Sequence, residues 1–280
     1  MGNQLFKFAN GLRVAEQFEN KLVLDISWYK HNYMKSNRVS SREFELDYFP
    51  EIKKIDKYVS SFPRIDKFRG KFERRLRPDI QRSIGLMTEF NQEKFERSPI
   101  CIDGSFERTI FLPNSDVLRW FLKFPSESSE WYEENLKYNF NRYVVAVHVR
   151  RTDYLNLAHI YDVVDKAYYL KAINEIYASN KEVALHLFSD DPDGAIRWLG
   201  DSIKFDKIIS QPINIPSGEV LRLMSTYDSI IAANSTFSWW AAYIGKLNKN
   251  VKKIFLPKKF SNLNNDNPEN FLWIQDCQFI

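Results

Sequence analysis

The sequence contains few of the residues that build metal centres or disulfide frameworks. Only 2 cysteines, Cys101 and Cys277, occur in 280 residues, and they lie too far apart in the chain to suggest either kind of site. The 4 histidines are scattered and form neither an H-E-x-x-H nor a Cys/His pattern. We therefore predict a protein of a reducing compartment with no structural metal.

The chain also lacks a long apolar run and a strong excess of one charge. No run reaches the ~18 residues of a membrane span, and the N-terminus has no signal-peptide core. The net charge of +4, with a pI near 8.8, is compatible with anionic substrates or an anionic membrane face. This net charge is too small to indicate nucleic-acid binding. These absences favour a cytoplasmic protein that binds no nucleic acid.

The second half of the chain alternates regularly between two kinds of pattern. β-Branched runs predict strands at 143–149, 183–189, 207–210, 229–234 and 253–257. Helical spacings predict helices between them at 165–179, 192–200, 217–227 and 237–246. This alternation indicates a parallel, doubly wound α/β sheet, and such sheets bind ligands beyond the carboxyl ends of their strands.

The first half is less regular. Apolar residues at helical spacing predict a helix over 2–18, and "KLVLDIS" predicts a strand over 21–27, so we expect a second α/β unit. The polar segment 122–135 contains proline and serine, which places a domain boundary there and divides the chain into 1–135 and 136–280. A basic amphipathic segment at 67–82 is either an ordinary surface helix or one that associates with an anionic membrane.

The motif "HVRRTDY" (148–154) follows a predicted buried strand. Arg150 and Arg151 can chelate phosphate oxygens in bidentate geometry. Neighbouring side chains leave a strand on opposite faces, so only one arginine can point straight at a ligand, and we expect the other to hold Asp153 or the loop. A structural ion pair is the alternative. The position at a strand's carboxyl end favours ligand binding.

The motif "FSDDPDG" (188–194) has three interpretations. Asp190, Asp191 and Asp193 could ligate a divalent ion. Asp191 followed by Pro192 could simply start a helix. One carboxylate could also accept hydrogen bonds from a ribose or base, as acidic residues near strand ends do in nucleotide-binding folds.

The motif "NSTFSWWAA" (234–242) offers Ser235 or Thr236 as the N-cap of a helix. The N–H groups at the start of that helix would form an anion site. Packing against the sheet is the default explanation for at least one of the adjacent tryptophans, Trp239 and Trp240.

These three motifs, in this order, resemble the H-x-R-R-x-D-Y, F-S-D-D and N-S-x-F-S-W-W motifs of the bacterial-type α-1,2-fucosyltransferase family of inverting glycosyltransferases. The opening "GNQLFKFANGLRVA" (2–15) is similar to the family's G-N-Q-L-F-Q-Y-A start. "DGSFERTIF" (103–111) is similar to its acceptor-domain segment G-Y-x-Q-S-E-x-Y-F. The resemblance covers nearly the whole chain.

The resemblance implies an α/β fold with two facing Rossmann-like domains (GT-B-like). In the family a short strand ending in Gly-Gly-Leu precedes the G-N-Q motif, and here Met1 stands in the place of that leucine. We therefore expect either that the start is assigned too far downstream or that the N-terminal domain lacks its first strand.

The resemblance also implies the ligands. GDP-L-fucose would bind the C-terminal domain without a metal or other cofactor, and Arg151 with Arg150 would neutralise its pyrophosphate as GDP leaves. The acceptor would approach the N-terminal domain, near Asn3 and Gln4. The residues implied for the donor are His148, Arg150, Arg151, Asp190, Asp191, Asn234, Ser235, Thr236 and Ser238.

The implied reaction moves L-fucose to the 2-hydroxyl of a terminal galactoside. Its base would be Asp153, for which orienting Arg150 is the other role, or Asp25 at the end of the 21–27 strand. We expect a galactose-terminated acceptor, with a lipid-linked glycan as one candidate, in surface polysaccharide biosynthesis, and a cytoplasmic enzyme that can contact the inner membrane peripherally. The alternative is a catalytically silent sugar-nucleotide or glycan-binding protein derived from such an enzyme.

Overall fold

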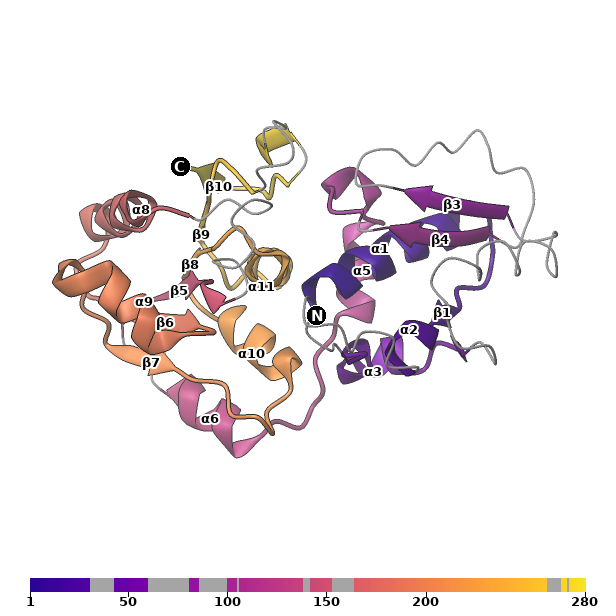
Figure 1. The fold of residues 1–280 in the computed structure, drawn as a ribbon, viewed down its shortest axis with the longest axis horizontal. Helices are drawn as coiled ribbons and strands as arrows, with labels where there is room; N and C mark the ends of the chain where they lie inside the picture. Colours follow the sequence, from indigo (N-terminus) through magenta and orange to yellow (C-terminus); the bar gives the residue numbers. More distant parts are fainter. Residues whose placement is uncertain are drawn as a thin grey trace. The chain divides into compact units, whose positions relative to one another are not determined.

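The structure is a computed structural model that describes residues 1–30, 43–59, 81–85, 100–104, 106–137, 142–152, 164–260, 268–270 and 272–280. By their contacts the residues group into two compact units (Figure 1). Unit 1 contains Met1 and Asn3–Lys123, and unit 2 contains Gly2 and Phe124–Ile280. The domain limits 1–135 and 136–280 stay a prediction. The segment 122–135, expected to be a polar connection, contains most of helix α6 (Glu130–Leu136), which packs on helix α10 of unit 2.

Unit 2 contains a six-stranded sheet in which every pairing is parallel (Figure 1). Its strands are β5 (Tyr143–Val149), β6 (Val183–Ser189), β7 (Lys207–Ile209), β8 (Ser229–Ile231), β9 (Lys253–Leu256) and β10 (Cys277–Phe279). The intervening helices are α8 (Lys166–Ser179), α9 (Pro192–Leu199), α10 (Ser217–Met224) and α11 (Thr236–Leu247). The predicted parallel, doubly wound sheet is confirmed. Strand β10 was not predicted from the sequence.

Burial explains why these segments form strands of a parallel sheet. A parallel sheet is covered on both faces, so its strands read as nearly continuous apolar runs. In β5 every residue from Val144 to Val149 is buried, and β6 is buried from Val183 to Phe188. Trp239 and Trp240 on α11 are both fully buried. Packing therefore accounts for both tryptophans, as was expected for at least one.

The strand order identifies one position in the sheet where ligands bind in this kind of fold. The order is β10-β9-β8-β5-β6-β7, so the chain runs outward from β5 to β7 and then returns to the other side of β5 at β8. Such a reversal is a topological switch point, and ligands bind at the carboxyl ends of the two strands beside it. The loops after β5 and β8 carry "RRTD" and "NSTF".

Unit 1 is also α/β, with two short parallel pairings among its described residues, β1 with β2 and β3 with β4. These strands are β1 (Leu24–Asp25), β2 (Lys57–Tyr58), β3 (Gln81–Gly85) and β4 (Ile100–Gly104). The helices are α1 (Gly2–Gln17), α2 (Ser27–Lys30), α3 (Pro50–Lys53) and α5 (Ser115–Phe121). Single 3-10 turns lie at Leu46–Tyr48, Thr109–Phe111, Gly200–Ser202 and Pro268–Asn270.

The predicted strand at 21–27 is too long. Only Leu24 and Asp25 pair with a neighbouring strand, because Asp25 Oδ1 accepts a hydrogen bond from the Ser27 N–H at 2.9 Å and helix α2 starts there. This contact is a side-chain cap that competes with the strand ladder. The predicted helix at 2–18 is confirmed as α1.

Some sequence predictions remain untested. Residues 67–80 of the basic segment and Asp153 lie outside the described residues, and the last two residues of that segment, Gln81 and Arg82, belong to strand β3 rather than to a helix. The facing arrangement of two domains and the missing first strand also stay predictions. Among the described helices, none is long and apolar enough to cross a membrane.

Candidate functional site

The candidate site lies in unit 2, where the loop after β5 meets the start of α11. The ring of His148, near the end of β5, lies 6.1 Å from the ring of Phe237, in the first turn of α11, measured between centroids. Ser235 is the N-cap of α11, and its Oγ accepts a hydrogen bond from the Phe237 N–H at 3.3 Å. The positive end of the helix dipole therefore lies close to the end of β5, which favours an anion there.

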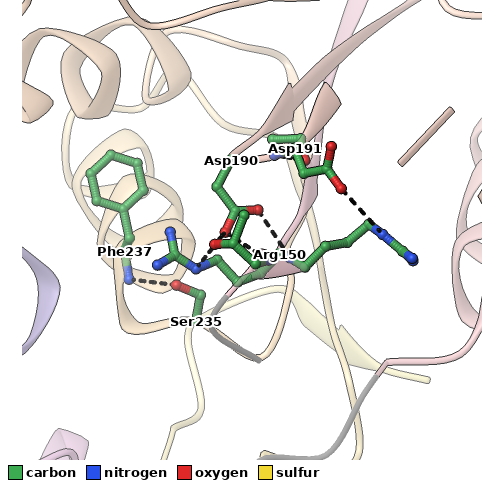
Figure 2. Close-up of polar contacts among 8 residues, drawn as sticks. Arg150, Asp190, Asp191, Ser235 and Phe237 are labelled. Carbon is green, nitrogen blue, oxygen red and sulfur yellow. Dashed lines mark hydrogen bonds and ion pairs between the residues drawn. The ribbon is translucent and has the colours of Figure 1, made fainter. Parts of the chain in front are cut away.

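Asp190, at the end of β6, holds the loop that follows β5. Its carboxylate accepts hydrogen bonds from the Arg151 N–H at 2.9 Å, from the Thr152 N–H at 3.2 Å and from the Thr152 hydroxyl. Its Oδ2 also lies 3.2 Å from Arg150 Nε (Figure 2). Burial disfavours the charged carboxyl, but the Thr152 hydrogen bond and the Arg150 charge outweigh burial and lower the pKa of Asp190. The Asp190 carboxylate thus binds groups of the protein's own loop after β5.

The two adjacent arginines have different surroundings, as strand alternation predicts. Arg150 Nε pairs with Asp190, whereas Arg151 Nε lies 4.0 Å from Asp191 Oδ2 and the Arg151 guanidinium lies 5.0 Å from the centre of the Trp198 ring. Figure 2 shows Arg150 against Asp190, with Asp191 pointing away from it.

Alternation along the strand also shows which arginine faces α11. His148 and Arg150 are two residues apart, so their side chains leave the chain on the same side, which is the side of Phe237. Arg150 therefore belongs to the α11 side of the loop, and Arg151 to the α9 side.

His148 is a neutral group inside this cationic site. The residue is 6% exposed, and its Nδ1 has no hydrogen-bond partner among the residues that the structure describes. Burial, reinforced by the charge of Arg150 and opposed by that of Asp190, lowers the pKa of His148 to about 3. At neutral pH the ring is therefore uncharged and can exchange a hydrogen bond with a polar ligand atom.

The polar side chains of residues 234–238 either shape the loop after β8 or stand at the start of helix α11. Asn234 Nδ2 donates to the Phe260 carbonyl at 3.2 Å, which anchors the loop after β8. Ser238 is fully buried, and its hydroxyl donates to the Ala233 and Ser235 carbonyls at 3.4 and 3.3 Å. Both side chains thus shape the loop, while Ser235 and Thr236 occupy the cap and first position of α11.

Asp191 is the N-cap of α9. Its Oδ1 accepts a hydrogen bond from the Gly194 N–H at 3.0 Å, and Pro192 occupies the first helical position, as the helix-start interpretation predicts. A Cβ on Gly194 would lie 1.8 Å from Asp191 Oδ2, so this cap requires glycine three residues later. Among the described residues no group of three or more His, Cys, Asp or Glu side chains is arranged to hold a metal ion.

The predicted acceptor-side residues lie in unit 1. Gln4 is buried, and its side-chain amide bridges the backbone of another segment by donating to the Glu43 carbonyl at 2.7 Å and accepting from the Glu45 N–H at 3.0 Å. Asn3 is partly exposed on the first turn of α1, and Asp25 is exposed at the end of β1. The structure thus gives Gln4 an internal role and leaves Asn3 and Asp25 at the surface of their unit.

Sequence reasoning missed three residues of the site. Thr152 fastens the loop to Asp190, Phe237 faces His148, and Trp198 supports Arg151. Thr152 and Phe237 lie inside the "RRTD" and "NSTF" motifs, so the motifs could have identified them as residues of the site. Trp198 lies outside every motif, and its role depends on how α9 packs beside β5.

Comparison with known proteins is consistent with this geometry. Residues 117–267 match Glycosyl transferase family 11. The O-antigen biosynthesis glycosyltransferase WbnK of Escherichia coli is 24% identical over 95% of this chain and 93% of its own length. An alpha-1,2-colitosyltransferase of Escherichia coli is 24% identical over 87% of this chain and 84% of its own length. A galactoside 2-alpha-L-fucosyltransferase of Caenorhabditis elegans is 27% identical over 56% of this chain and 46% of its own length.

Two solved structures are also similar. POFUT1 in complex with GDP-fucose is 14% identical, with a TM-score of 0.49 over 88% of this chain and 91% of that chain. NodZ alpha-1,6-fucosyltransferase co-crystallised with GDP is 16% identical, with a TM-score of 0.48 over 87% of this chain and 88% of that chain.

Proposed function

The chain belongs to glycosyltransferase family 11, and we propose that it transfers L-fucose from GDP-L-fucose to the 2-hydroxyl of a terminal galactoside, with inversion at the anomeric carbon. The family makes it an enzyme of the fucosyltransferase type. The names of two relatives, an alpha-1,2-colitosyltransferase and a galactoside 2-alpha-L-fucosyltransferase, support the 1,2 linkage and the galactoside acceptor.

The observation that carries the proposal is the cationic site at the switch point of the unit 2 sheet. Arg150 and the N-terminus of α11 lie on the same side of the loop after β5, and both attract anions. A nucleoside diphosphate would place its phosphates there. The Arg150 side chain is 32% exposed, so a ligand can reach it while its Nε stays paired with Asp190.

The same groups explain how the site promotes departure of GDP. When the bond between the anomeric carbon and the β-phosphate oxygen breaks, negative charge develops on that oxygen. Arg150 and the α11 dipole are already oriented, because Asp190 holds the arginine and Ser235 caps the helix. A fixed positive environment stabilises this charge without reorganisation during the reaction. Two arginines and a helix terminus would supply the potential without a metal.

His148 contributes a different property to the donor site. A second cation beside Arg150 would repel it, whereas a neutral imidazole does not. We assign its Nδ1 a hydrogen bond with the donor.

The biological acceptor is proposed from the relatives. The name of WbnK supports a surface polysaccharide such as O-antigen. A lipid-linked glycan presented at the cytoplasmic side of the inner membrane would then be the substrate, and the enzyme would contact that anionic surface peripherally.

The proposal is tested by incubating the purified chain with a β-galactoside acceptor and either GDP-L-fucose or GDP-colitose. We expect GDP release that depends on the acceptor, and a fucosylated product whose NMR spectrum shows the sugar on O2 of galactose. Transfer of colitose alone would change the donor and keep the reaction type. GDP binding with no product from a panel of galactosides would contradict the proposed activity.

A further inference from the structure

The two strands beside the switch point of unit 2 part at a defined hydrogen bond. The Asp228 N–H donates to the Val144 carbonyl at 3.1 Å, and the bonds of a parallel ladder repeat every two residues on each strand. Continued along β5 and β8, this ladder would bring the Ala232 N–H to the His148 carbonyl. Instead the Ala232 N–H donates to the Phe255 carbonyl of β9 at 3.0 Å. The strands therefore separate just after Val147 and Ile231, the last pair in register.

Two adjacent tyrosines of α8 bind the backbone where the strands separate. The Tyr169 hydroxyl donates to the His148 carbonyl at 3.1 Å, in place of the absent ladder bond. The Tyr168 hydroxyl shares its hydrogen between the Ala232 and Phe255 carbonyls, at 2.7 and 2.9 Å. Buried carbonyls need such partners. Each of the two strand ends is thus fixed by a side chain of the same helix.

The surroundings of the two tyrosines hold their hydroxyls in place. Tyr168 is 7% exposed and Tyr169 1% exposed, and their rings meet edge to face at 5.0 Å between centroids. Both belong to the hydrophobic cluster that contains Val147 and Val149. Burial raises the pKa of both hydroxyls, so both stay protonated and can donate.

The tyrosines lie on the opposite face of the sheet from the candidate anion site. Side chains alternate along a strand, so Val147 and Val149 point to the α8 face while His148 points to the α11 face, where it meets Phe237. The tyrosine hydroxyls therefore act on the site through the backbone and not through a ligand.

Both strand ends lead directly into groups of the candidate site. Arg150 follows the His148 carbonyl by two residues, and Ser235, the N-cap of α11, follows Ala232 by three. The distance between the Arg150 backbone and the start of α11 thus depends on how far β5 and β8 part. The bonds from Tyr168 and Tyr169 set that separation at the last residues before the two loops.

Tyr169 also contacts the support of the second arginine. Its ring meets the Trp198 ring edge to face at 5.9 Å, and the Arg151 guanidinium lies 5.0 Å from the centre of the same Trp198 ring. The loop after β5 is therefore connected to α8 at His148 and, through Trp198, at Arg151.

We propose that Tyr168 and Tyr169 are positioning residues of the donor site, whose hydroxyls fix the ends of β8 and β5 at the separation that lets Arg150 and the first turn of α11 bind the same diphosphate. The inference rests on the proposed function, because the diphosphate is that of the proposed donor. It extends the site to a pair of residues that touch neither the donor nor its charged partners.

The test compares Tyr168→Phe and Tyr169→Phe with Tyr177→Phe. The first two replacements remove a buried hydroxyl and keep the ring, and the third removes a hydroxyl from a residue of α8 that is 49% exposed. Calorimetric titration with GDP and with GMP gives two dissociation constants for each protein. Their ratio, GMP over GDP, measures what the second phosphate contributes to binding. Thermal unfolding checks that each variant is folded at the titration temperature.

We expect the ratio to fall roughly 3- to 10-fold in Tyr168→Phe and in Tyr169→Phe, the equivalent of about one hydrogen bond to the diphosphate. Tyr177→Phe should keep the wild-type ratio. A variant that only loses stability would melt at a lower temperature with the ratio unchanged, and this result for either buried tyrosine would overturn its positioning role. An equal fall in Tyr177→Phe would overturn the role of both.

Nucleotide binding and product formation separate this inference from the proposed function. A wild type that binds GDP but makes no product from any galactoside would refute the proposed reaction, and the ratio of dissociation constants would still decide the role of the tyrosines. A wild type that binds neither GDP nor GMP would refute both.

Discussion

Replacing Asp190 with asparagine tests whether one carboxylate organises the donor site. Asp190 accepts three hydrogen bonds from Arg151 and Thr152 and pairs with Arg150. An asparagine has one acceptor oxygen, and its NH₂ group must face donors. In the better of its two orientations the oxygen keeps the contacts of Oδ2, and the NH₂ group opposes the Arg151 N–H, which then has no acceptor in the protein.

The cost follows from these contacts. Water can reach the loop, so we take the lower end of the values for a lost acceptor and for the loss of charge assistance, which gives about 1–2 kcal/mol in total. For a unit of this size the melting temperature should fall by roughly 3–6 °C. Arg150 would also lose its anionic partner and its fixed position. We therefore expect affinity for GDP to fall about tenfold, or ~1.4 kcal/mol.

Calorimetric unfolding and titration with GDP measure the two effects of Asp190→Asn. Asp193→Asn is the matched control, because Asp193 is an exposed acid in the first turn of α9 and its loss removes only a favourable helix-dipole contact of ~0.3–1 kcal/mol. An Asp190→Asn protein with the melting temperature and GDP affinity of the control would refute the idea that Asp190 holds the loop.

Three further predictions concern charge at the site and in the core. Arg150→Lys should lower kcat/KM about 100-fold, equal to ~3 kcal/mol, because lysine cannot make the bidentate phosphate contact. Arg151→Lys should lower kcat/KM less. Equal losses for the two variants in steady-state assays would contradict the different roles of the two arginines. Transfer should continue in excess EDTA, and loss of activity that Mn²⁺ or Mg²⁺ restores would show that the aspartates after β6 bind a metal. The pKa values of His148 and His186 are lowered to about 3 and about 4, so the unfolded chain binds protons between these values and pH 6.5 that the folded chain does not. Each histidine should therefore lower the free energy of unfolding by roughly 1.4 kcal/mol per pH unit below pH 6.5. In His148→Gln one of these two contributions should be absent when the free energies of urea unfolding at pH 5 and pH 7 are compared. An unchanged pH dependence would show that His148 is not buried in the neutral form.

Local sequence patterns predicted the unit 2 sheet well. The predicted limits of β5 and β6 agree with the structure at both ends, because a strand buried on both faces is a continuous apolar run bounded by polar residues. Strand β10 has three residues, none of them fully buried, and its pairing with β9 depends on tertiary contacts. The strand at 21–27 was predicted too long because the Asp25 side-chain cap, which ends it, does not alter the apolar pattern.

The site was predictable as a set of segments but not as a set of roles. The motifs identified the loops after β5, β6 and β8, since polar residues after apolar runs mark strand ends. They did not show that Asp190 is occupied by the loop backbone, or that the Ser238 hydroxyl is used by backbone carbonyls. Those roles arise from the pairing of β5 with β6 and from the packing of α11, which bring together residues distant in sequence.

A crystal structure of the protein with bound GDP would show where the donor's phosphates lie. We expect the diphosphate between the Arg150 guanidinium and the first turn of α11, within hydrogen-bond distance of both, while Asp190 keeps its contact with the Arg151 N–H. A diphosphate bound on the α9 side, against Arg151 and Trp198, or anywhere away from the loop after β5, would contradict it.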